Sequence, residues 1–329
     1  MSESNLDKKT VLIAPLNWGL GHATRMVPTI KKYRQDGWTV YIASDGDALL
    51  WLQKEFPDFL IFDVGVKTLR YAQSGCFLLH LKQLLPTFLN NIKQEHLWLE
   101  QFVKQHPVDL IISDNRYGFW HANIKSIFVS HQFNLPVPWY LFWSKFIAQY
   151  WLRKQIEQFT KIWILDDANH QLAGRLSHLK LYTKPHQFIG LQSRFNIQKQ
   201  AIQYDYLLLA SGLAPHKQHL IDTFYSIVKT KKHLRIAIVG GKPQNFDETS
   251  QIKCFNILNT ADLNYLLSLS ETIVARSGYS TIMDLIRLDK KAILIPTPGQ
   301  PEQEYLADHH KTKKSWLILK HIGHLMDFL

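Results

Sequence analysis

Short apolar runs alternate with segments of helical periodicity along the whole chain, and this alternation limits the fold more than any other feature. Runs such as Val11–Pro15, Trp38–Ala43 and Val108–Ser113 have the length of buried strands, and helical patterns such as Ala23–Gln35 and Ala48–Phe56 separate them. Strands that alternate with helices in this way form βαβ units around a parallel sheet with both faces covered.

The pattern stops at a polar stretch, Asn196–Gln203, and then begins again with a strand at Tyr204–Ala210. We therefore predict an α/β protein with two tandem Rossmann-like, doubly wound domains, residues 1–198 and 199–329, that face a cleft. The remaining expected strands are Phe59–Val64, Ser126–Val129 and Lys161–Leu165 in the first domain, and Leu234–Val239, Phe255–Leu258, Thr272–Ala275, Ala292–Ile295 and Trp316–Leu319 in the second. Residues 76–105 are expected to be helical, with a break or kink at Pro86.

Composition excludes several classes of protein. With 46% hydrophobic and 20% charged residues, the chain is globular, and 329 residues suit two domains. Only Cys76 and Cys254 are present, which excludes a disulfide scaffold and a zinc ribbon. The polar N-terminus does not resemble a secretory signal, and no run has the length of a membrane span. We expect a cytoplasmic protein, with a peripheral position on the inner face of the membrane as a further possibility.

The net charge of +11 could attract nucleic acid, anionic lipid or a phosphorylated substrate. The basic residues are dispersed, however, and no nucleic-acid-binding motif is present. We therefore expect no nucleic-acid partner, although such a binder stays open as an alternative.

A glycine-bearing turn follows the first strand, with Gly19, Gly21 and His22 ahead of a helix. A strand, such a turn and a helix start can hold an anion, because backbone N–H groups and the positive helix end face outward. Thr24 stands where the dinucleotide fingerprint needs its third glycine, so a nicotinamide cofactor is not expected. His22 lies where open α/β sheets bind ligands, at the carboxyl end of a strand.

Two more turns carry groups suited to a nucleotide and a sugar. Ser277, Gly278, Ser280 and Thr281 offer donors to a phosphate, and Asp284 lies one helical turn further on, where a carboxylate can accept ribose hydroxyls. An ordinary helix cap with a surface acid would explain the same residues. In the segment Pro298–Ala307, the side chains of Glu302, Gln303 and Glu304 suit sugar hydroxyls.

Together these motifs resemble, in order and spacing, the GT-B glycosyltransferases, most closely family 28, the group of the cell-wall undecaprenyl-linked N-acetylglucosaminyltransferase. The resemblance implies that the second domain binds a nucleotide-sugar donor, most commonly a UDP-sugar, and the first an acceptor. It assigns the ribose to Asp284 and the donor sugar to Glu302, Gln303 and Glu304. It implies further donor contacts at Gly21, Arg194, Ser211, Gly212, Asn259, Thr260, Arg276, Ser277, Gly278, Ser280 and Thr281.

Three departures separate the chain from the cell-wall enzyme itself. Asp284 replaces the more usual glutamate, Leu20 stands where a third glycine is common, and the turn that begins at Ser211 is poorer in glycine. The resemblance implies transfer with inversion, for which His22 is the candidate base and Asp114 its orienting partner. A turn cap would also explain Asp114. We expect no metal and no cofactor besides the sugar nucleotide.

Two further functions stay open on the same fold. A nucleotide-sugar 2-epimerase would carry extra acids and bases around the sugar, and a non-catalytic nucleotide-sugar binder would have no need of His22.

The segment Leu135–Lys154 contains seven aromatic residues in twenty and only basic charges. Trp139, Trp143 and Tyr150 share a helical face, and such residues favour a membrane interface. The segment predicts contact with a membrane surface and a lipid-linked acceptor. The same aromatic spacing would also arise if the helix packed on the sheet or on a partner subunit. In that case we would expect a small-molecule acceptor.

Overall fold

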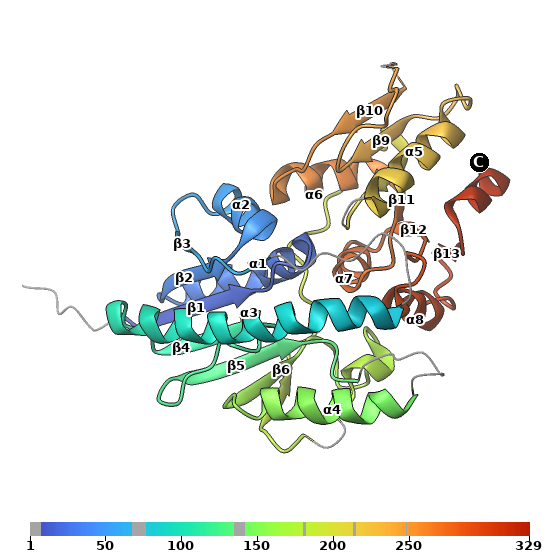
Figure 1. Ribbon diagram of the computed structural model, residues 1–329. Helices are drawn as coiled ribbons and strands as arrows, with labels where there is room; N and C mark the ends of the chain where they lie inside the picture. The colour runs from blue at the N-terminus through green and yellow to red at the C-terminus, as the bar shows by residue number, and fades with distance from the viewer. Residues whose placement is uncertain are drawn as a thin grey trace, which may run out of the picture. The chain divides into compact units, whose positions relative to one another are not determined.

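The computed structural model describes residues 8–67, 77–134, 142–179, 182–212, 215–247, 249 and 251–329. The chain divides into two compact units, Met1–Gln192 and Ser193–Leu329. The second unit begins a few residues before the expected linker, because Ser193 and Arg194 bond to side chains of that unit. Each unit is an α/β layer structure around one parallel sheet, and the strand and helix labels are shown in Figure 1.

The first unit contains a seven-stranded parallel sheet in the order β3-β2-β1-β4-β5-β6-β7. Its strands are β1 (Thr10–Pro15), β2 (Thr39–Ser44), β3 (Leu60–Asp63), β4 (Leu110–Asp114), β5 (Lys125–Ser130), β6 (Lys161–Ile164) and β7 (His186–Phe188). The central strands β1 and β4 are buried along their whole length, which explains their unbroken apolar runs. The edge strand β7 was not predicted, because its sequence is short and mostly exposed.

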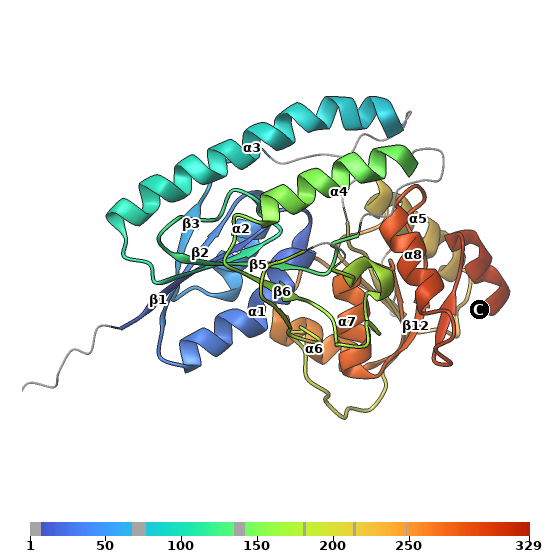
Figure 2. The same ribbon diagram turned by 90° about the horizontal axis from the view of Figure 1, so that it is seen from below.

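Helices cover both faces of this sheet. α1 (Leu20–Gln35) and α2 (Gly46–Glu55) lie on one face, and α3 (Phe77–Gln105) and α4 (Phe142–Ile156) lie side by side on the other (Figure 2). Leu99 of α3 packs on the β1 side of the sheet, and Leu152 of α4 packs on the β5 side. A short 3₁₀ turn, η2 (Gly174–Ser177), follows β6.

The predicted break at Pro86 is wrong, since α3 runs continuously for 29 residues through this proline. Proline removes one helical hydrogen bond. Leu99 and Phe102, further along the helix, are buried against the sheet, so packing holds most of α3 in place independently of that one bond.

The second unit contains a six-stranded parallel sheet in the order β10-β9-β8-β11-β12-β13. Its strands are β8 (Tyr204–Leu209), β9 (Ile236–Val239), β10 (Ile252–Phe255), β11 (Ser270–Ala275), β12 (Lys291–Leu294) and β13 (Trp316–Ile318), and its helices are α5 (His216–Val228), α6 (Thr260–Ser268), α7 (Tyr279–Leu288), α8 (Pro301–His309) and the 3₁₀ segment η3 (Ile322–Phe328). Ile322 and Leu325 of η3 join the core beside α5. The expected strand Phe255–Leu258 begins earlier, at Ile252.

A buried guanidinium ties four elements of the first unit together. Arg116 is fully buried, and it forms an ion pair with Asp45 at the start of α2 and with Glu95 of α3 at 2.8 Å. Its Nε donates to the carbonyl of Pro15 at the end of β1, 3.1 Å away. Burial raises the pKa of Glu95, although Arg116 and the N–H of Gly118 act in the opposite direction.

The backbone at Gly118 is packed so closely on α3 that no side chain fits. A Cβ atom there would lie 2.4 Å from the carbonyl oxygen of Ile92 and 2.6 Å from Cβ of Glu95. The N–H of Gly118 donates to Glu95 at 3.2 Å, which anchors the loop to the same carboxylate that Arg116 holds.

We predict that Gly118→Ala lowers the free energy of unfolding by about 1–3 kcal/mol, because helix backbone cannot move aside as a flexible side chain can. Chemical denaturation of the purified variant measures this loss. Gly323→Ala is the matched control, since its new methyl group would meet nothing within 4 Å. Equal free energies of unfolding for the two variants would show that α3 can move away from residue 118 at no cost.

Candidate functional site

His22 and Asp114 lie together at the carboxyl edge of the first sheet. Gly19, whose φ of +76° favours glycine, precedes α1 and turns the chain so that His22 falls in the first turn of that helix. Asp114 ends β4, in register with Pro15 at the end of β1. His22 Nδ1 is 3.2 Å from Asp114 Oδ2, the spacing that an orienting carboxylate needs.

Two residues that the sequence reasoning missed complete this cluster. Arg25 is buried and engages both carboxylate oxygens of Asp114, with 2.9 Å between Nε and Oδ2. Its Nη2 is 2.8 Å from His22 Nδ1, and its Nη1 is 3.1 Å from Nδ1 of His131, the residue after β5. The spacing of Arg25, three residues after His22 on one helix, was the available signal.

The cluster restricts the proton on His22. Arg25 can only donate and Asp114, when ionised, can only accept, yet both approach the same ring nitrogen. If Nδ1 accepts from Arg25, then Nε2 carries the proton and cannot act as a base. If Nδ1 donates to Asp114, then Nε2 has a free lone pair. The second tautomer is the one that can remove a proton from a hydroxyl.

Burial and the neighbouring Arg25 determine the charge states of His22 and Asp114. Burial lowers the pKa of His22, and Arg25 lowers it further, while Asp114 acts in the opposite direction. Burial by itself would raise the pKa of Asp114, but Arg25 and His22 outweigh it and bring this pKa down to about 2. At neutral pH the pair is therefore a neutral imidazole beside a carboxylate.

In the second unit, Asp284 of α7 is held by a residue far away in sequence. Ser193 Oγ donates to its Oδ1 at 2.5 Å. Burial raises the pKa of Asp284 to about 6, and Arg194 and Ser193 offset only part of this effect. The helix begins after Gly278, where an added Cβ would meet nothing within 4 Å. Ser280 and Thr281, in its first turn, are partly exposed.

Arg194 extends from the same segment toward α6. Its Nη1 donates to the Thr260 hydroxyl at 3.4 Å, and Asn259 caps α6 by accepting from the N–H of Asp262 at 2.8 Å. Asn264, one turn beyond Thr260 and absent from the sequence-based site, has a buried Oδ1 without a hydrogen bond in the described part of the chain. Arg194, Thr260, Asp284 and Ser193 form one linked polar group.

Two residues predicted to contact the donor bond to the protein backbone. The Arg276 guanidinium is buried and donates to the carbonyls of Ile295 and Pro296, at 3.2 and 3.0 Å. The Ser277 hydroxyl is buried as well and donates to the carbonyl of Gln303 at 2.8 Å. Both side chains support the loop after β12, and the contact of Arg276 with the diphosphate stays a prediction.

The candidate sugar-binding residues shape the loop between β12 and α8. Gln303 Oε1 accepts from the N–H of Thr297 at 2.9 Å, while its Nε2 donates to Gln300 at 2.6 Å. The exposed Glu304 accepts from the N–H of Gly299 at 3.2 Å. Glu302 is partly exposed in the first turn of α8.

The other predicted phosphate contacts are glycine turns at strand ends. Ser211 and Gly212 are exposed after β8, and Gly212 has a φ of +99°. Gly21 lies in the first turn of α1, where its carbonyl accepts from the Thr24 hydroxyl at 3.2 Å. Among the residues that the structure describes, no group of three His, Cys, Asp or Glu side chains is arranged to hold a metal ion.

We predict that Arg25→Met raises the pKa of His22, because it removes the cation that disfavours the imidazolium. Titration of the histidine ring signals by NMR measures the change. Arg34→Met, on the exposed side of the same helix, should leave the His22 titration as it is. If the pKa of His22 is the same in the two variants, Arg25 has no electrostatic effect on His22.

We predict that Asp284→Asn stabilises the ligand-free protein by about 1–3 kcal/mol at pH 7. The pKa of Asp284 is about 6 in the folded chain, against an ordinary 3.8, so the folded state favours the protonated acid. Its contribution to stability is therefore largest below pH 4 and is lost as the pH rises through 6. Thermal unfolding between pH 4 and 8 measures this slope, which the exposed control Asp289→Asn should keep and Asp284→Asn should reduce.

Comparison with known proteins agrees with the resemblance seen in the sequence. Residues 220–320 match the glycosyltransferase family 28 C-terminal domain. No curated protein sequence matches the chain at a significant level. The sequence alone predicted this fold, and the structural matches confirm it.

Three solved structures illustrate the likeness. The glycosyltransferase of kitacinnamycin has a TM-score of 0.64 at 12% identity, covering 95% of this chain and 86% of its own. VinC in complex with DTDP has a TM-score of 0.61 at 14% identity, covering 97% and 90%. MurG of Acinetobacter baumannii has a TM-score of 0.54 at 11% identity, covering 98% and 89%. These findings show that the chain has the GT-B fold and that residues 220–320 match the family 28 C-terminal domain.

Proposed function

We propose that the protein transfers a hexose or N-acetylhexosamine from a nucleoside-diphosphate sugar to a hydroxyl acceptor, with inversion at the anomeric carbon. The observation that carries the proposal is the His22–Asp114 pair at a strand end, beside Arg25. Solved neighbours in complex with DTDP and with thymidine diphosphate support a nucleotide donor. A UDP-sugar is our first choice and a thymidine nucleotide the second.

The reaction needs a base and a group that relieves charge on the leaving diphosphate. Nε2 of His22 takes the acceptor proton while the acceptor oxygen bonds to the anomeric carbon and the bond from that carbon to the diphosphate oxygen breaks. Asp114 then stabilises the imidazolium. N–H groups at the start of α7 and the guanidinium of Arg194 meet the charge on the diphosphate, in place of a metal ion.

In this proposal Asp284 accepts hydrogen bonds from the ribose, and Asn259 and Thr260 lie near the base. Glu302 contacts the donor sugar, and Gln303 and Glu304 keep the loop around it in shape. Gly21, Ser211, Gly212 and Gly278 contribute backbone N–H groups near the phosphates. Ser280 and Thr281 contribute hydroxyls to the same site.

A nucleotide-sugar 2-epimerase on this fold is the competing enzyme. Transfer liberates a nucleoside diphosphate and yields a glycosylated acceptor, whereas epimerisation yields a changed sugar nucleotide. Incubation with labelled UDP-sugars and chromatography of the products therefore separates the two reactions.

We propose further that α4 and α3 bring the protein to a membrane surface on the inner face, where a lipid-linked acceptor would lie. Phe146, Ile147 and Tyr150 of α4 are 72%, 67% and 61% exposed, and Leu85 and Leu89 of α3 are also exposed. The opposite side of α4 is buried in the core, where Leu152 and Ile156 pack. In the described part of the chain, no helix is long and apolar enough to cross a membrane.

The aromatic face predicted from the sequence coincides only in part with these exposed side chains of α3 and α4. Trp139 lies outside the described residues, and the side chain of Trp143 is not described. Trp151, in the same predicted segment, packs inward, with ring centroids 5.7 Å from Phe88 and 5.8 Å from Tyr117. Lys154 lies over the ring of Tyr150 at 5.1 Å and adds a cation beside the apolar side chains.

We predict that His22→Ala lowers turnover on the order of a hundredfold or more while nucleotide affinity stays within about twofold, because the base acts on the acceptor alone. Release of nucleoside diphosphate measures turnover, and calorimetry measures affinity. Asp114→Asn should be milder, since it misorients the ring without removing it. Wild-type turnover in His22→Ala would remove this residue from the reaction.

We predict that the protein co-sediments with vesicles that contain anionic lipid, and that salt weakens the binding. Replacing Phe146 and Tyr150 together with serine should release the protein without unfolding it, because both side chains are exposed. Leu50→Ser, which changes an exposed leucine of α2, is the control. Equal sedimentation of all three proteins would assign the acceptor to solution.

A further inference from the structure

Ser193 begins the second unit and bonds to the residue that we assign to the ribose. Its Oγ donates to Oδ1 of Asp284 at 2.5 Å, although the two residues are 91 positions apart in sequence. The same Oγ accepts from the backbone N–H of Phe195 at 3.2 Å. A serine hydroxyl has one hydrogen and two lone pairs, and the N–H uses a lone pair, so the hydrogen is free to remain on Asp284.

The segment that carries Ser193 is fixed within the second unit. Arg194 Nη1 donates to the Thr260 hydroxyl at 3.4 Å, and the ring of Phe195 is buried. Arg287 of α7 donates from Nε to the carbonyl of Phe195, also at 3.4 Å. The Ser193 hydroxyl is therefore in place before any ligand binds.

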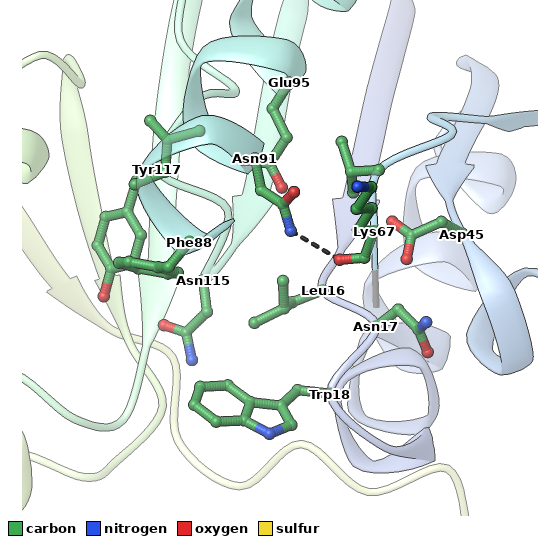
Figure 3. A pocket seen from close by; sticks show the side chains of 12 residues that line it. Leu16, Asn17, Trp18, Asp45, Lys67, Phe88, Asn91, Glu95, Asn115 and Tyr117 are labelled. Carbon is green, nitrogen blue, oxygen red and sulfur yellow. Dashed lines mark hydrogen bonds between the residues drawn. The ribbon is translucent and has the colours of Figure 1, made fainter. Parts of the chain in front are cut away.

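The partner of Asp284 is an uncharged group, and this separates it from two buried carboxylates of the first unit. Figure 3 shows that pair, Asp45 and Glu95, and both form ion pairs with the guanidinium of Arg116. Their charge is used to hold the fold. Asp284 is partly exposed, and a hydroxyl fills one of the roughly four acceptor positions of its carboxylate. The other positions are left for a ligand.

The bond from Ser193 also keeps Asp284 in the form that accepts hydrogen bonds. Burial raises the pKa of Asp284 to about 6, and Arg194 and Ser193 both act to lower it. A donor that bonds to a carboxylate favours the ionised form over the acid. At neutral pH Asp284 is therefore an acceptor with one permanent donor.

A permanent donor changes what a missing ligand hydroxyl costs. A site built around one hydroxyl of its ligand rejects an analogue without it, because the ligand then covers a polar group that has lost its partner. Asp284 keeps its bond to Ser193 whether or not a second donor arrives. The loss of one ligand hydroxyl should therefore cost the net value of one hydrogen bond, and not the larger cost of an unpaired carboxylate.

We propose that Ser193 makes the donor site tolerant of 2′-deoxyribose, so that the enzyme accepts sugar nucleotides of both the ribose and the deoxyribose class. The proposal rests on the proposed function, because it takes Asp284 as the ribose contact. The 3′-hydroxyl, which both sugars possess, bonds to Oδ2 of Asp284 while Ser193 bonds to Oδ1. Both carboxylate oxygens then have a donor, and the 2′-hydroxyl adds only a further bond. Ser193 is thus a specificity-determining residue.

Calorimetry of the full chain with UDP and with 2′-deoxy-UDP tests the proposal, since these probes differ only in the 2′-hydroxyl. We expect their dissociation constants to lie within about tenfold of each other in the wild type, the value of one net hydrogen bond. In Ser193→Ala the preference for UDP should widen by a further factor of about five or more, because Asp284 loses its permanent donor.

Two variants separate this effect from a general disturbance of the site. Ser193→Thr keeps the hydroxyl and should keep the wild-type ratio of the two dissociation constants. Ser226→Ala removes an exposed hydroxyl of α5 that bonds to Thr223 within its own helix, and it should also keep that ratio. Carboxyl NMR of the ligand-free protein adds a measurement that needs no nucleotide, in which the pKa of Asp284 should rise in Ser193→Ala.

The outcomes distinguish this proposal from the proposed function. If both nucleotides bind but the wild type prefers UDP by much more than tenfold, or if Ser193→Ala keeps the wild-type ratio, the role of Ser193 is overturned and the transferase stands. An unchanged Asp284 titration in Ser193→Ala would overturn that role as well. Binding of neither nucleotide would overturn both proposals. Similar binding of both, with no nucleoside diphosphate released from any sugar nucleotide, would support the role of Ser193 and overturn the transferase.

Discussion

The buried guanidinium of Arg116 is the constraint on which the first unit depends. A charge with no exposure to solvent is costly unless carboxylates surround it, and Asp45 and Glu95 come from two different helices. The arginine thereby fixes α2 and α3 against the ends of β1 and β4, where His22 and Asp114 lie. Loss of Arg116 would leave two carboxylates in the interior without their shared cation, so this one side chain is the member that the arrangement can least spare.

Arg25 makes the His22–Asp114 cluster different from a simple histidine–aspartate pair. It keeps Asp114 ionised and disfavours a proton on His22, and it competes for the ring nitrogen that Asp114 must orient. Such a cluster favours the neutral imidazole of His22 at neutral pH. The tautomer that can act as a base then depends on the balance between two contacts of similar length.

The fold was predictable because strands buried on both faces are unbroken apolar runs, as in Val11–Ala14. The proximity of His22 and Asp114 was predictable too, since parallel strands end at one edge. Arg25 and His131 were not, because an arginine on a helix is normally a surface residue. Arg276 was assigned to the donor on its motif alone, and only the structure reveals the carbonyls that it supports.

The loop after β12 is held by one set of hydrogen bonds. Arg276 and Ser277 from one turn and Gln303 from α8 hold its backbone through bonds that span 19, 26 and 6 residues of sequence, respectively. An alanine scan of these three positions would therefore report collapse of the loop and not lost contacts with a sugar. In evolution these three positions should therefore vary together, because each one holds the same stretch of backbone.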